Sequence, residues 1–557
     1  MFPWKQRLAK YFKIGPYEVA ASALVAWSVV FRVILVTLNY PETNSDEGTM
    51  GIEAMHIAFQ GQHPIYLYGQ NYMGVLEAYL AAPFFHLFGV SVFTLRIGMF
   101  ILFALFMVAM YWLASLLYSK KLALVSLALL SLATGDMLIQ QLRAVGGAIE
   151  TLLFGTLLLV LAYRLASTAG QRQRWRYLAY AAWGFTMGIA LWVHFLVLPF
   201  VLCGGLLILI FCRREWRSPA LPCLLLGLLI GGSLLIPGYQ VFTTVLGIHG
   251  GGIVTTKHTS LFQQILSTVL WGIPLATGVQ PVCAVTDLPT YGPANALTVP
   301  CSLLHGAWSA GYLLLLGAGL LMSALVCWRL WRQRQNQGGP LSAEEQQRAV
   351  LHAARLLLLL TAVLTILLYV SSPLSGLKPW STRYLVGLLV ATPGILWPLW
   401  RLTGLEHFQL TRARITKWLS RVAIALIMLV WLAGTVYTVT TVPTAIADTR
   451  QQEQLVRDLL KLNVRHVYVE YWTCYRLLFQ SQEQILCARP PYPSVVGADR
   501  YEPDARPVQA DPHSAYMFPA DSTQEIALFE QYIKENGERF QKYEMDGMVV
   551  YVPLTER

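Results

Sequence analysis

Long apolar runs recur along most of this chain, and they constrain its fold more than any other feature. About twenty consecutive apolar residues in a helix cross the hydrocarbon core of a bilayer. Runs of roughly that length lie near residues 19–38, 91–117, 122–135, 147–166, 177–193, 196–212, 219–237, 307–330, 351–371, 384–401 and 421–440. Backbone polar groups in lipid must be hydrogen-bonded within their own segment, so these runs predict helices. The sequence therefore predicts a mainly α, polytopic membrane protein of about 11 transmembrane helices.

Charge divides the chain near residue 440. Residues 1–440 carry a surplus of 16 positive charges and residues 441–557 a surplus of 5 negative charges, which together give the net charge of +11. Most cations of the first part fall in alternate loops, so the positive-inside rule places those loops and the N-terminus in the cytoplasm. An odd number of spans then puts residues 441–557 outside the plasma (inner) membrane. The basic balance thus reflects membrane topology and does not indicate a nucleic-acid partner.

We predict two domains. Residues 1–440 form a transmembrane domain with large outer loops at about 39–90 and 238–306. Residues 441–557 alternate between helical and strand patterns. The segments "TRQQEQLVRDLLKL" and "TQEIALFEQYIKENG" predict helices, the second of which ends at Gly537, whereas "VRHVYVEYW" and "MVVYV" predict strands. This pattern predicts a small extracytoplasmic α/β domain.

Four cysteines lie on the predicted outer side. Cys283 and Cys301 share the second outer loop, and Cys474 and Cys487 share the C-terminal domain. Disulfides form and persist on the oxidising side of the membrane, so each pair is a candidate disulfide. Free buried thiols are the alternative for both pairs.

Carboxylates concentrate at the predicted outer interface. They are Asp46 and Glu47 directly after the first span, Glu53 and Glu77 on predicted interfacial helices, and Asp136 and Glu150 beside the next outer turn. A carboxylate in such a place can take a proton from an attacking hydroxyl, and others can hold a divalent cation through oxygen ligands. A solvated acidic loop is the alternative.

Few cations and aromatic residues remain on the outer side to complement these acids. Arg383 precedes Tyr384 at the start of a span, Arg143 precedes a Gly-Gly pair, and Lys257 lies in the second outer loop. The arginine guanidinium matches phosphate oxygens, and interfacial snorkelling is the alternative. Candidates for lining a substrate groove are Tyr66, Tyr68, Tyr72 and His194. Tyrosines are also enriched at membrane interfaces, and simple packing also explains the histidine.

Together these residues resemble the GT-C superfamily of membrane glycosyltransferases, in the branch of bacterial aminoarabinose transferase and the protein O-mannosyltransferases. The resemblance rests on the Asp46-Glu47 pair, on "YLYGQNYMGVLEAYLAAPFFHLFGVSVFTLR", on "LRAVGGAIETLLFG" and on "STRYLVGLLVATP", and it covers roughly residues 15–440. It implies an inverting enzyme that moves a sugar from a polyprenyl-phosphate donor in the outer leaflet to a lipid, glycan or protein acceptor.

The resemblance also implies roles for the acids. Asp46 is the general base, and Glu47 orients it or supports the acceptor site. Glu150 or Asp136 is the second acidic residue, and the sequence leaves open which one. A divalent metal (Mg, Mn or Zn) is a candidate cofactor at that second position.

On the donor side, the resemblance implies that cations hold the leaving group. Arg383, with Tyr384, binds the leaving polyprenyl phosphate, helped by Arg143 or Lys257. A phosphate leaving group needs charge stabilisation more than it needs a proton, so cations can supply what the reaction requires.

Two other classes of function stay open at this point. A transporter or flippase for lipid-linked saccharides typically needs charged residues within its spans or two repeated halves. The middle of each predicted span lacks Asp and Glu, and the sequence shows no repeat. A non-catalytic scaffold whose tail binds a partner is the second alternative, and the intact Asp46-Glu47 pair argues against it.

Overall fold

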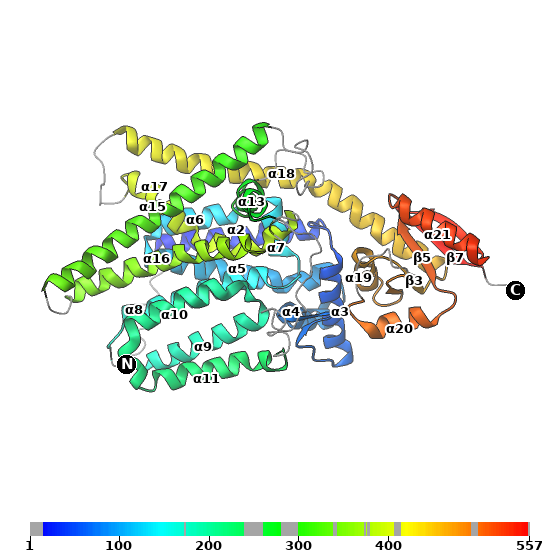
Figure 1. The fold of residues 1–557 in the computed structure, drawn as a ribbon, viewed down its shortest axis with the longest axis horizontal. Coiled ribbons are helices and arrows are strands. Elements are labelled where there is room, and N and C mark those ends of the chain that lie inside the picture. Colours follow the sequence, from blue (N-terminus) through cyan, green and yellow to red (C-terminus); the bar gives the residue numbers. More distant parts are fainter. Residues whose placement is uncertain are drawn as a thin grey trace. The chain divides into compact units, whose positions relative to one another are not determined.

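A computed structural model gives the fold of the chain (Figure 1). It describes residues 15–171, 174–238, 260–279, 299–337, 342–372, 375, 379–405, 414–491 and 499–554. Lys257 and Cys283 lie outside these residues, as does the side chain of Cys301. The chain divides into two compact units. The first contains Met1–Phe31, Ile101–Gln141 and Gly147–Val439, and the second contains Arg32–Phe100, Leu142–Gly146 and Thr440–Arg557.

The first unit is helical. Four helices have residues in both units: α2 (Pro16–Thr37), α5 (Val92–Leu117), α7 (Gly135–Leu142) and α18 (Arg414–Lys461). The α-helices that lie wholly in the first unit are α6 (Lys120–Ser131), α8 (Ala148–Ser167), α9 (Trp175–Val193), α10 (Leu198–Cys212), α11 (Ala220–Gly232), α13 (Leu261–Ser267), α14 (Ile273–Ala276), α15 (Val299–Gln337), α16 (Ala343–Val370) and α17 (Thr392–Leu402). The 3-10 helices are η1 (Phe195–Val197), η2 (Arg213–Arg217), η3 (Ser233–Gly238) and η6 (Pro379–Ala391), and η4 (Thr268–Gly272) is a π-helical turn.

Within the described residues, eight helices are long and apolar enough to cross a membrane, or nine if the bent pair α6–α7 is one span. The prediction of a mainly helical, multi-pass membrane protein is therefore confirmed. The predicted number of about eleven exceeds this count. The predicted spans 122–135, 177–193 and 219–237 are all helical, but α6 bends by 90° into α7 and α11 has only 13 residues. Helix α9 falls short in hydropathy because it begins with polar and aromatic residues.

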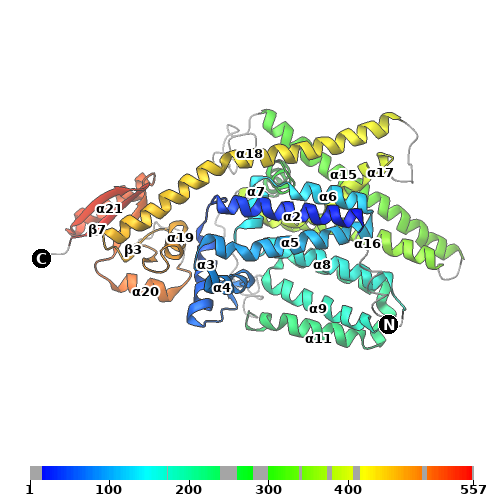
Figure 2. The same cartoon turned by 180° about the vertical axis from the view of Figure 1, so that it is seen from behind.

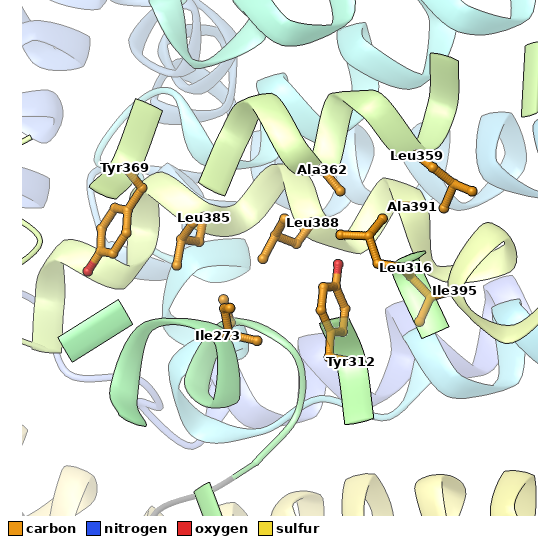
Figure 3. Packing of buried hydrophobic residues seen from close by; sticks show 11 residues of the cluster. Ile273, Tyr312, Leu316, Leu359, Ala362, Tyr369, Leu385, Leu388, Ala391 and Ile395 are labelled. Atoms are coloured by element: carbon orange, nitrogen blue, oxygen red, sulfur yellow. The ribbon is translucent and has the colours of Figure 1, made fainter. Parts of the chain in front are cut away.

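An apolar cluster in the first unit surrounds the 3-10 helix η6. This helix has 13 residues, whereas 3-10 helices longer than four residues are uncommon. Residues three apart in a 3-10 helix lie above one another, so Leu385, Leu388 and Ala391 form one apolar row. Figure 3 shows this row packed against side chains of α15 and α16, among them Tyr312 and Leu359. The irregular helix is thus held by packing on a regular apolar ridge.

Helices α9 and α11 lie side by side, and glycines line the contact between them (Figure 2). Gly184 and Gly188 on α9 face Gly227 and Gly231 on α11. A Cβ atom on Gly184 or Gly227 would collide with a backbone carbonyl oxygen of the other helix. Small residues four apart let membrane helices approach closely, where van der Waals packing holds them together.

The second unit consists of short helices, a hairpin and a five-stranded sheet. Its elements before the sheet are α3 (Ser45–Gln60), β1 (Tyr66–Leu67), β2 (Gln70–Gly74) and α4 (Leu76–Phe88). Its C-terminal elements are β3 (His466–Tyr468), α19 (Tyr471–Gln480), β4 (Leu486–Ala488), α20 (Glu502–Ala510), β5 (Ala515–Pro519), α21 (Thr523–Asn536), β6 (Phe540–Met545) and β7 (Met548–Pro553). The strand order is β4-β3-β5-β7-β6. Strand β3 runs parallel to β4 and β5, and β5, β7 and β6 are antiparallel neighbours.

The prediction of a small C-terminal α/β domain is confirmed. Helix α21 ends at Gly537, which has a left-handed φ of 68°, and β7 covers the predicted final strand. Two details differ from the prediction. Helix α18 runs unbroken from Arg414 to Lys461, so the predicted helix after residue 440 continues the last span (Figure 1). Strand β3 has only three residues because α19 begins at Tyr471. A disulfide joins Cys474 of α19 to Cys487 of β4, with their Cα atoms 5.6 Å apart.

Candidate active site

Helix α3 carries the acidic pair that follows the first span. It begins after Asn44, whose side chain accepts a hydrogen bond from the Glu47 amide at 3.0 Å, and it ends at Gly61. Asp46 and Glu47 therefore lie in the first turn, where the unpaired N–H groups of the helix favour negative charge. Both are buried, so this is not a solvated acidic loop.

Two residues of the C-terminal domain hold the Asp46 carboxylate. The Tyr471 hydroxyl donates to Asp46 Oδ1 at 2.6 Å, and Arg500 Nη2 donates to the same oxygen at 2.6 Å. The Arg500 guanidinium also lies over the Tyr471 ring, 4.9 Å from its centroid. The side chains of Arg500 and Asp46 are only 10% and 12% exposed. The carboxylate is therefore fixed in place by charge and by hydrogen bonds.

Small residues on α3 allow this close approach to α19. Ser45 Oγ donates to the carbonyl oxygens of Tyr471 and Trp472, at 2.6 and 2.9 Å. A Cβ atom on Gly48 would collide with the backbone of α19, and one on Gly51 would collide with the Phe479 ring. Ser45 and these two glycines are spaced three apart, so they lie on one face of α3. Figure 2 shows α3 and α19 next to each other.

Glu47 is engaged in a buried ion pair. Arg96 donates to both Glu47 carboxylate oxygens, from Nε at 2.7 Å and from Nη2 at 2.6 Å, and both side chains are 0% exposed. Arg96 Nη1 also donates to the carbonyl of Pro41, and the Ala144 amide donates to Glu47 Oε1 at 3.0 Å. The pair ties α3 to the first turn of α5 and to segment 142–146. On this geometry Glu47 holds the first turn of α3 in place.

Glu53 is a buried acid that holds a proton. Its Oε1 accepts a hydrogen bond from the Tyr68 amide at 2.5 Å, while Oε2 has no hydrogen-bond partner among the described residues. Burial raises the pKa of Glu53 to about 9, opposed by the Tyr68 amide and by the charge of Arg500. At neutral pH this residue is therefore a neutral carboxylic acid.

Two of the predicted donor-side residues, Arg383 and Tyr384, lie on η6 in the first unit. Arg383 Nη2 donates to the Tyr384 hydroxyl at 3.1 Å, and its guanidinium lies 5.0 Å from the centroid of that ring. The rings of Tyr384 and His194 are 6.4 Å apart. The Thr382 hydroxyl donates to Asp136 Oδ2 at 3.0 Å. The structure thus brings one candidate acid, a cation and two rings to a single 3-10 segment.

The remaining predicted residues lie as follows. Glu150 is buried in the first turn of α8. Arg143 belongs to the second unit, where its Nε donates to the carbonyl of Glu42 at 2.7 Å. His194 Nδ1 accepts from the Leu196 amide at 3.1 Å and caps η1, which supports a packing role.

The three candidate groove tyrosines belong to the β1–β2 hairpin. Tyr66 lies on β1 and Tyr72 on β2. Tyr68, in the turn, stacks on Tyr501 with ring centroids 4.3 Å apart. Its hydroxyl is bonded to His56 Nδ1 at 2.9 Å and to Gln62 at 2.8 Å. One face of the Tyr68 ring is therefore already covered by protein.

The described acids around Asp46 do not form a metal centre. In the part of the chain that the structure describes, no group of three or more His, Cys, Asp or Glu side chains is arranged to hold a metal ion. Asp46 is neutralised by Arg500, Glu47 is neutralised by Arg96, and a proton occupies Glu53. Charge at this site is balanced by arginines of the chain.

Sequence reasoning missed Tyr471 and Arg500. Both lie in the acidic tail, far along the chain from Asp46, so no local pattern links them to it. The signal that was available is the three-residue spacing of Ser45, Gly48 and Gly51, which indicates a helix face built for close contact. The spacing predicts that another segment packs against this face of α3, but it does not identify that segment.

Comparison with known proteins gives a weak likeness of fold. No protein-family profile and no curated protein match the chain. The apo oligosaccharyltransferase of Archaeoglobus fulgidus aligns over 92% of this chain and 70% of its own, with 13% identity and a TM-score of 0.49. Apo ArnT from Cupriavidus metallidurans aligns over 96% and 98%, with 12% identity and a TM-score of 0.49. Both belong to the GT-C superfamily that the sequence resembles. At such identities and TM-scores these structures assign no role to any residue of this chain.

Proposed function

We propose that this protein is an inverting glycosyltransferase, which moves a sugar from a polyprenyl-phosphate donor to a lipid, glycan or protein acceptor at the outer face of the plasma (inner) membrane. The observation that carries the proposal is the buried Asp46 carboxylate, placed in the first turn of α3 just after the first span and held by Arg500 and Tyr471. The family resemblance over residues 15–440 supports it.

Asp46 acts as the general base in this proposal. An acceptor hydroxyl attacks the anomeric carbon of the donor sugar, and its proton passes to Asp46. The new carbon–oxygen bond forms on the face opposite the phosphate. The bond from the anomeric carbon to the phosphate oxygen breaks, and its electron pair stays on the phosphate. Arg500 and Tyr471 both donate to Asp46 Oδ1 and so hold the carboxylate in place.

Arg383 is the proposed ligand of the leaving phosphate. Its guanidinium presents a planar set of donors suited to phosphate oxygens, and the Tyr384 ring and hydroxyl hold it. Arg143 and Lys257 are the proposed helpers. The hydrogen bond from Thr382 to Asp136 links that acid to the segment of Arg383, which favours Asp136 over Glu150 as the second acid.

The proposed orientation has the N-terminus in the cytoplasm and the C-terminal domain outside. Helix α18 supports it, because its first turns carry Arg414, Lys417 and Arg421 and its other end leads into the sheet. A helix of 48 residues is about 70 Å long, more than twice the thickness of the hydrocarbon core. Since cations favour the cytoplasmic side, the opposite end projects from the outer face.

The test is sugar transfer in proteoliposomes with a panel of polyprenyl-phosphate sugars. Wild type is compared with Asp46→Asn and with Asp521→Asn, a matched change at an exposed aspartate. We expect transfer, or slow donor hydrolysis, by wild type and Asp521→Asn. A normally folded Asp46→Asn should lose about 10²- to 10⁴-fold in rate. Equal activity of Asp46→Asn would remove this residue from catalysis, and a donor that every variant binds but none turns over would favour a carrier or a scaffold.

A further inference from the structure

We propose that Arg500 and Tyr471 are positioning residues of the reaction: the C-terminal domain sets the orientation and the base strength of Asp46. The inference rests on the proposed function, because it takes Asp46 as the base. Its consequence is that the domain is a working part of the active site, and not only an attachment to the transmembrane bundle.

The first support is the convergence of two donors on one oxygen. Tyr471 and Arg500 both donate to Asp46 Oδ1 at 2.6 Å. A charged donor and a hydroxyl at this distance stabilise the ionised carboxylate strongly, because the side chains of Arg500 and Asp46 are nearly buried and solvent screens them little. The pair therefore controls both where the carboxylate points and how readily it accepts a proton.

The second support is that Arg500 is itself held from several sides. The Gln70 amide oxygen, in the orientation that satisfies its hydrogen bonds, accepts from Arg500 Nη2 at 2.9 Å and from Nη1 at 3.1 Å. The Tyr471 ring lies under the guanidinium. The backbone amides of Arg500 and Tyr501 both donate to the Tyr475 hydroxyl. A side chain with so many fixed contacts is preorganised for its partner.

The third support is the anchoring of the helix that carries Tyr471. Its N-terminal carbonyls accept from Ser45, and its backbone packs where Gly48 has no side chain. The disulfide from Cys474 to Cys487 fixes the same helix to β4. Helix α19 thus cannot shift along α3 without breaking contacts on several sides.

A purely structural ion pair is the competing explanation, and pH separates the two. The titratable and charged groups described around Asp46 and its partners include Tyr471 and Tyr475 on α19, Asp499 and Arg500 ahead of α20, Glu47 and Glu53 on α3, and Arg96 and Arg143 beside Glu47. Glu47 is already paired with Arg96, and Glu53 is neutral at the pH of interest. Arg500 is therefore the charge whose removal changes the base.

The direction of the effect follows from the charges. Removing the positive charge of Arg500 makes the ionised form of Asp46 less favourable, because a nearby opposite charge stabilises a carboxylate. A base works only when deprotonated, so activity is lost at a higher pH as the solution is acidified. A docking contact alone would lower stability and leave this pH dependence unchanged.

The experiment measures kcat/KM against pH in proteoliposomes, with whichever polyprenyl-phosphate sugar of the panel the wild type turns over. The full-length variants are Arg500→Gln, Arg500→Lys and Tyr471→Phe. The control is Arg506→Gln, at an exposed arginine paired with Glu502. We expect the acid limb of Arg500→Gln to move up by about one to three pH units, that of Arg500→Lys by less, and that of the control by none. Tyr471→Phe should give a smaller upward shift than Arg500→Gln.

An unshifted acid limb in a folded Arg500→Gln would overturn the inference while leaving the proposed function intact. Where Arg500→Gln does not fold, Tyr471→Phe decides, because it removes only one oxygen atom. An acid limb and kcat equal to wild type in that variant would overturn the inference as well. Absence of transfer by the wild type with every donor would instead contradict the proposed function, so the two failures are distinguishable.

Discussion

Two pairs of helices in this protein approach each other closely at glycines, and the two contacts have different consequences. Helices α9 and α11 meet through Gly184, Gly188, Gly227 and Gly231, and helices α3 and α19 meet at Gly48 and Gly51. The first contact is surrounded by apolar side chains of the membrane-spanning unit. The second brings a carboxylate of α3 against a cation and a phenol of the C-terminal domain.

The two contacts differ in what the close approach of the helix backbones achieves. Between membrane helices, small residues give van der Waals contact where lipid offers no hydrophobic drive. Outside the spans, the same small residues let backbones approach until short polar side chains such as Asp46 reach their partners. The first contact determines how helices pack, and the second places a carboxylate within reach of a cation and a phenol.

The largest effect is expected where the second unit buries charge. Arg96→Met removes the cation that pairs with Glu47 in a site that is 0% exposed, which should lower the free energy of unfolding by about 3–5 kcal/mol. The control is Arg348→Met, which removes an exposed i,i+4 pair with Glu344 and should cost less than about 0.5 kcal/mol. Thermal unfolding in detergent measures both. Equal melting temperatures for the two variants would show that the Arg96 pair is not a brace.

The comparison of the two contacts is tested by replacing one glycine in each contact with alanine. Gly48→Ala and Gly227→Ala each place a Cβ atom against a backbone carbonyl and should destabilise by about 1–3 kcal/mol. Only Gly48→Ala should also shift the acid limb of the pH–rate profile, because only that contact positions Arg500 against Asp46. Gly311→Ala, where a Cβ atom would meet nothing within 4 Å, is the control and should not destabilise.

A contrary result would be as informative. If Gly227→Ala moved the acid limb as far as Gly48→Ala does, the two contacts would not be functionally distinct. If neither variant lost stability, the close packing of glycines would not contribute to the fold.

The last comparison is Glu53→Gln, which tests the neutral acid beside Arg500. Burial raises the pKa of Glu53 from 4.5 to about 9, so the native state keeps a proton that the unfolded chain releases. Wild-type stability therefore falls as pH rises between these values, by at most about 1.4 kcal/mol per pH unit. Glu53→Gln keeps the bond from the Tyr68 amide and lacks this slope. The free energy of unfolding, measured from pH 5 to 8.5, should rise for the variant relative to wild type as the pH increases. Parallel plots of this free energy against pH would mean that Glu53 is ionised in the folded protein.

Much of the fold could be predicted from the sequence because membrane insertion acts on local composition. Each predicted span falls on helix, and Gly537 ends α21 where the turn chemistry requires a left-handed residue. Among the described residues, length and hydropathy leave α9 and α11 marginal, and for this reason the predicted number of about eleven spans exceeds the eight or nine that pass both criteria. The boundary at residue 440 is a change in composition that α18 crosses without a break, since a helix can leave the membrane and continue in water.

Only part of the candidate site could be predicted from the sequence: its acids, but not the residues that pair with them. By itself the sequence determined that acids gather after the first span, that Asp46 follows a membrane helix, and that the tail contains both helices and strands. Only the tertiary structure decided that Arg96 neutralises Glu47 and that Arg500 and Tyr471 hold Asp46. Helices and turns are selected by neighbouring residues, whereas a buried charge is satisfied by whatever cation the fold brings within about 3 Å, and for Asp46 that cation lies 454 positions along the chain.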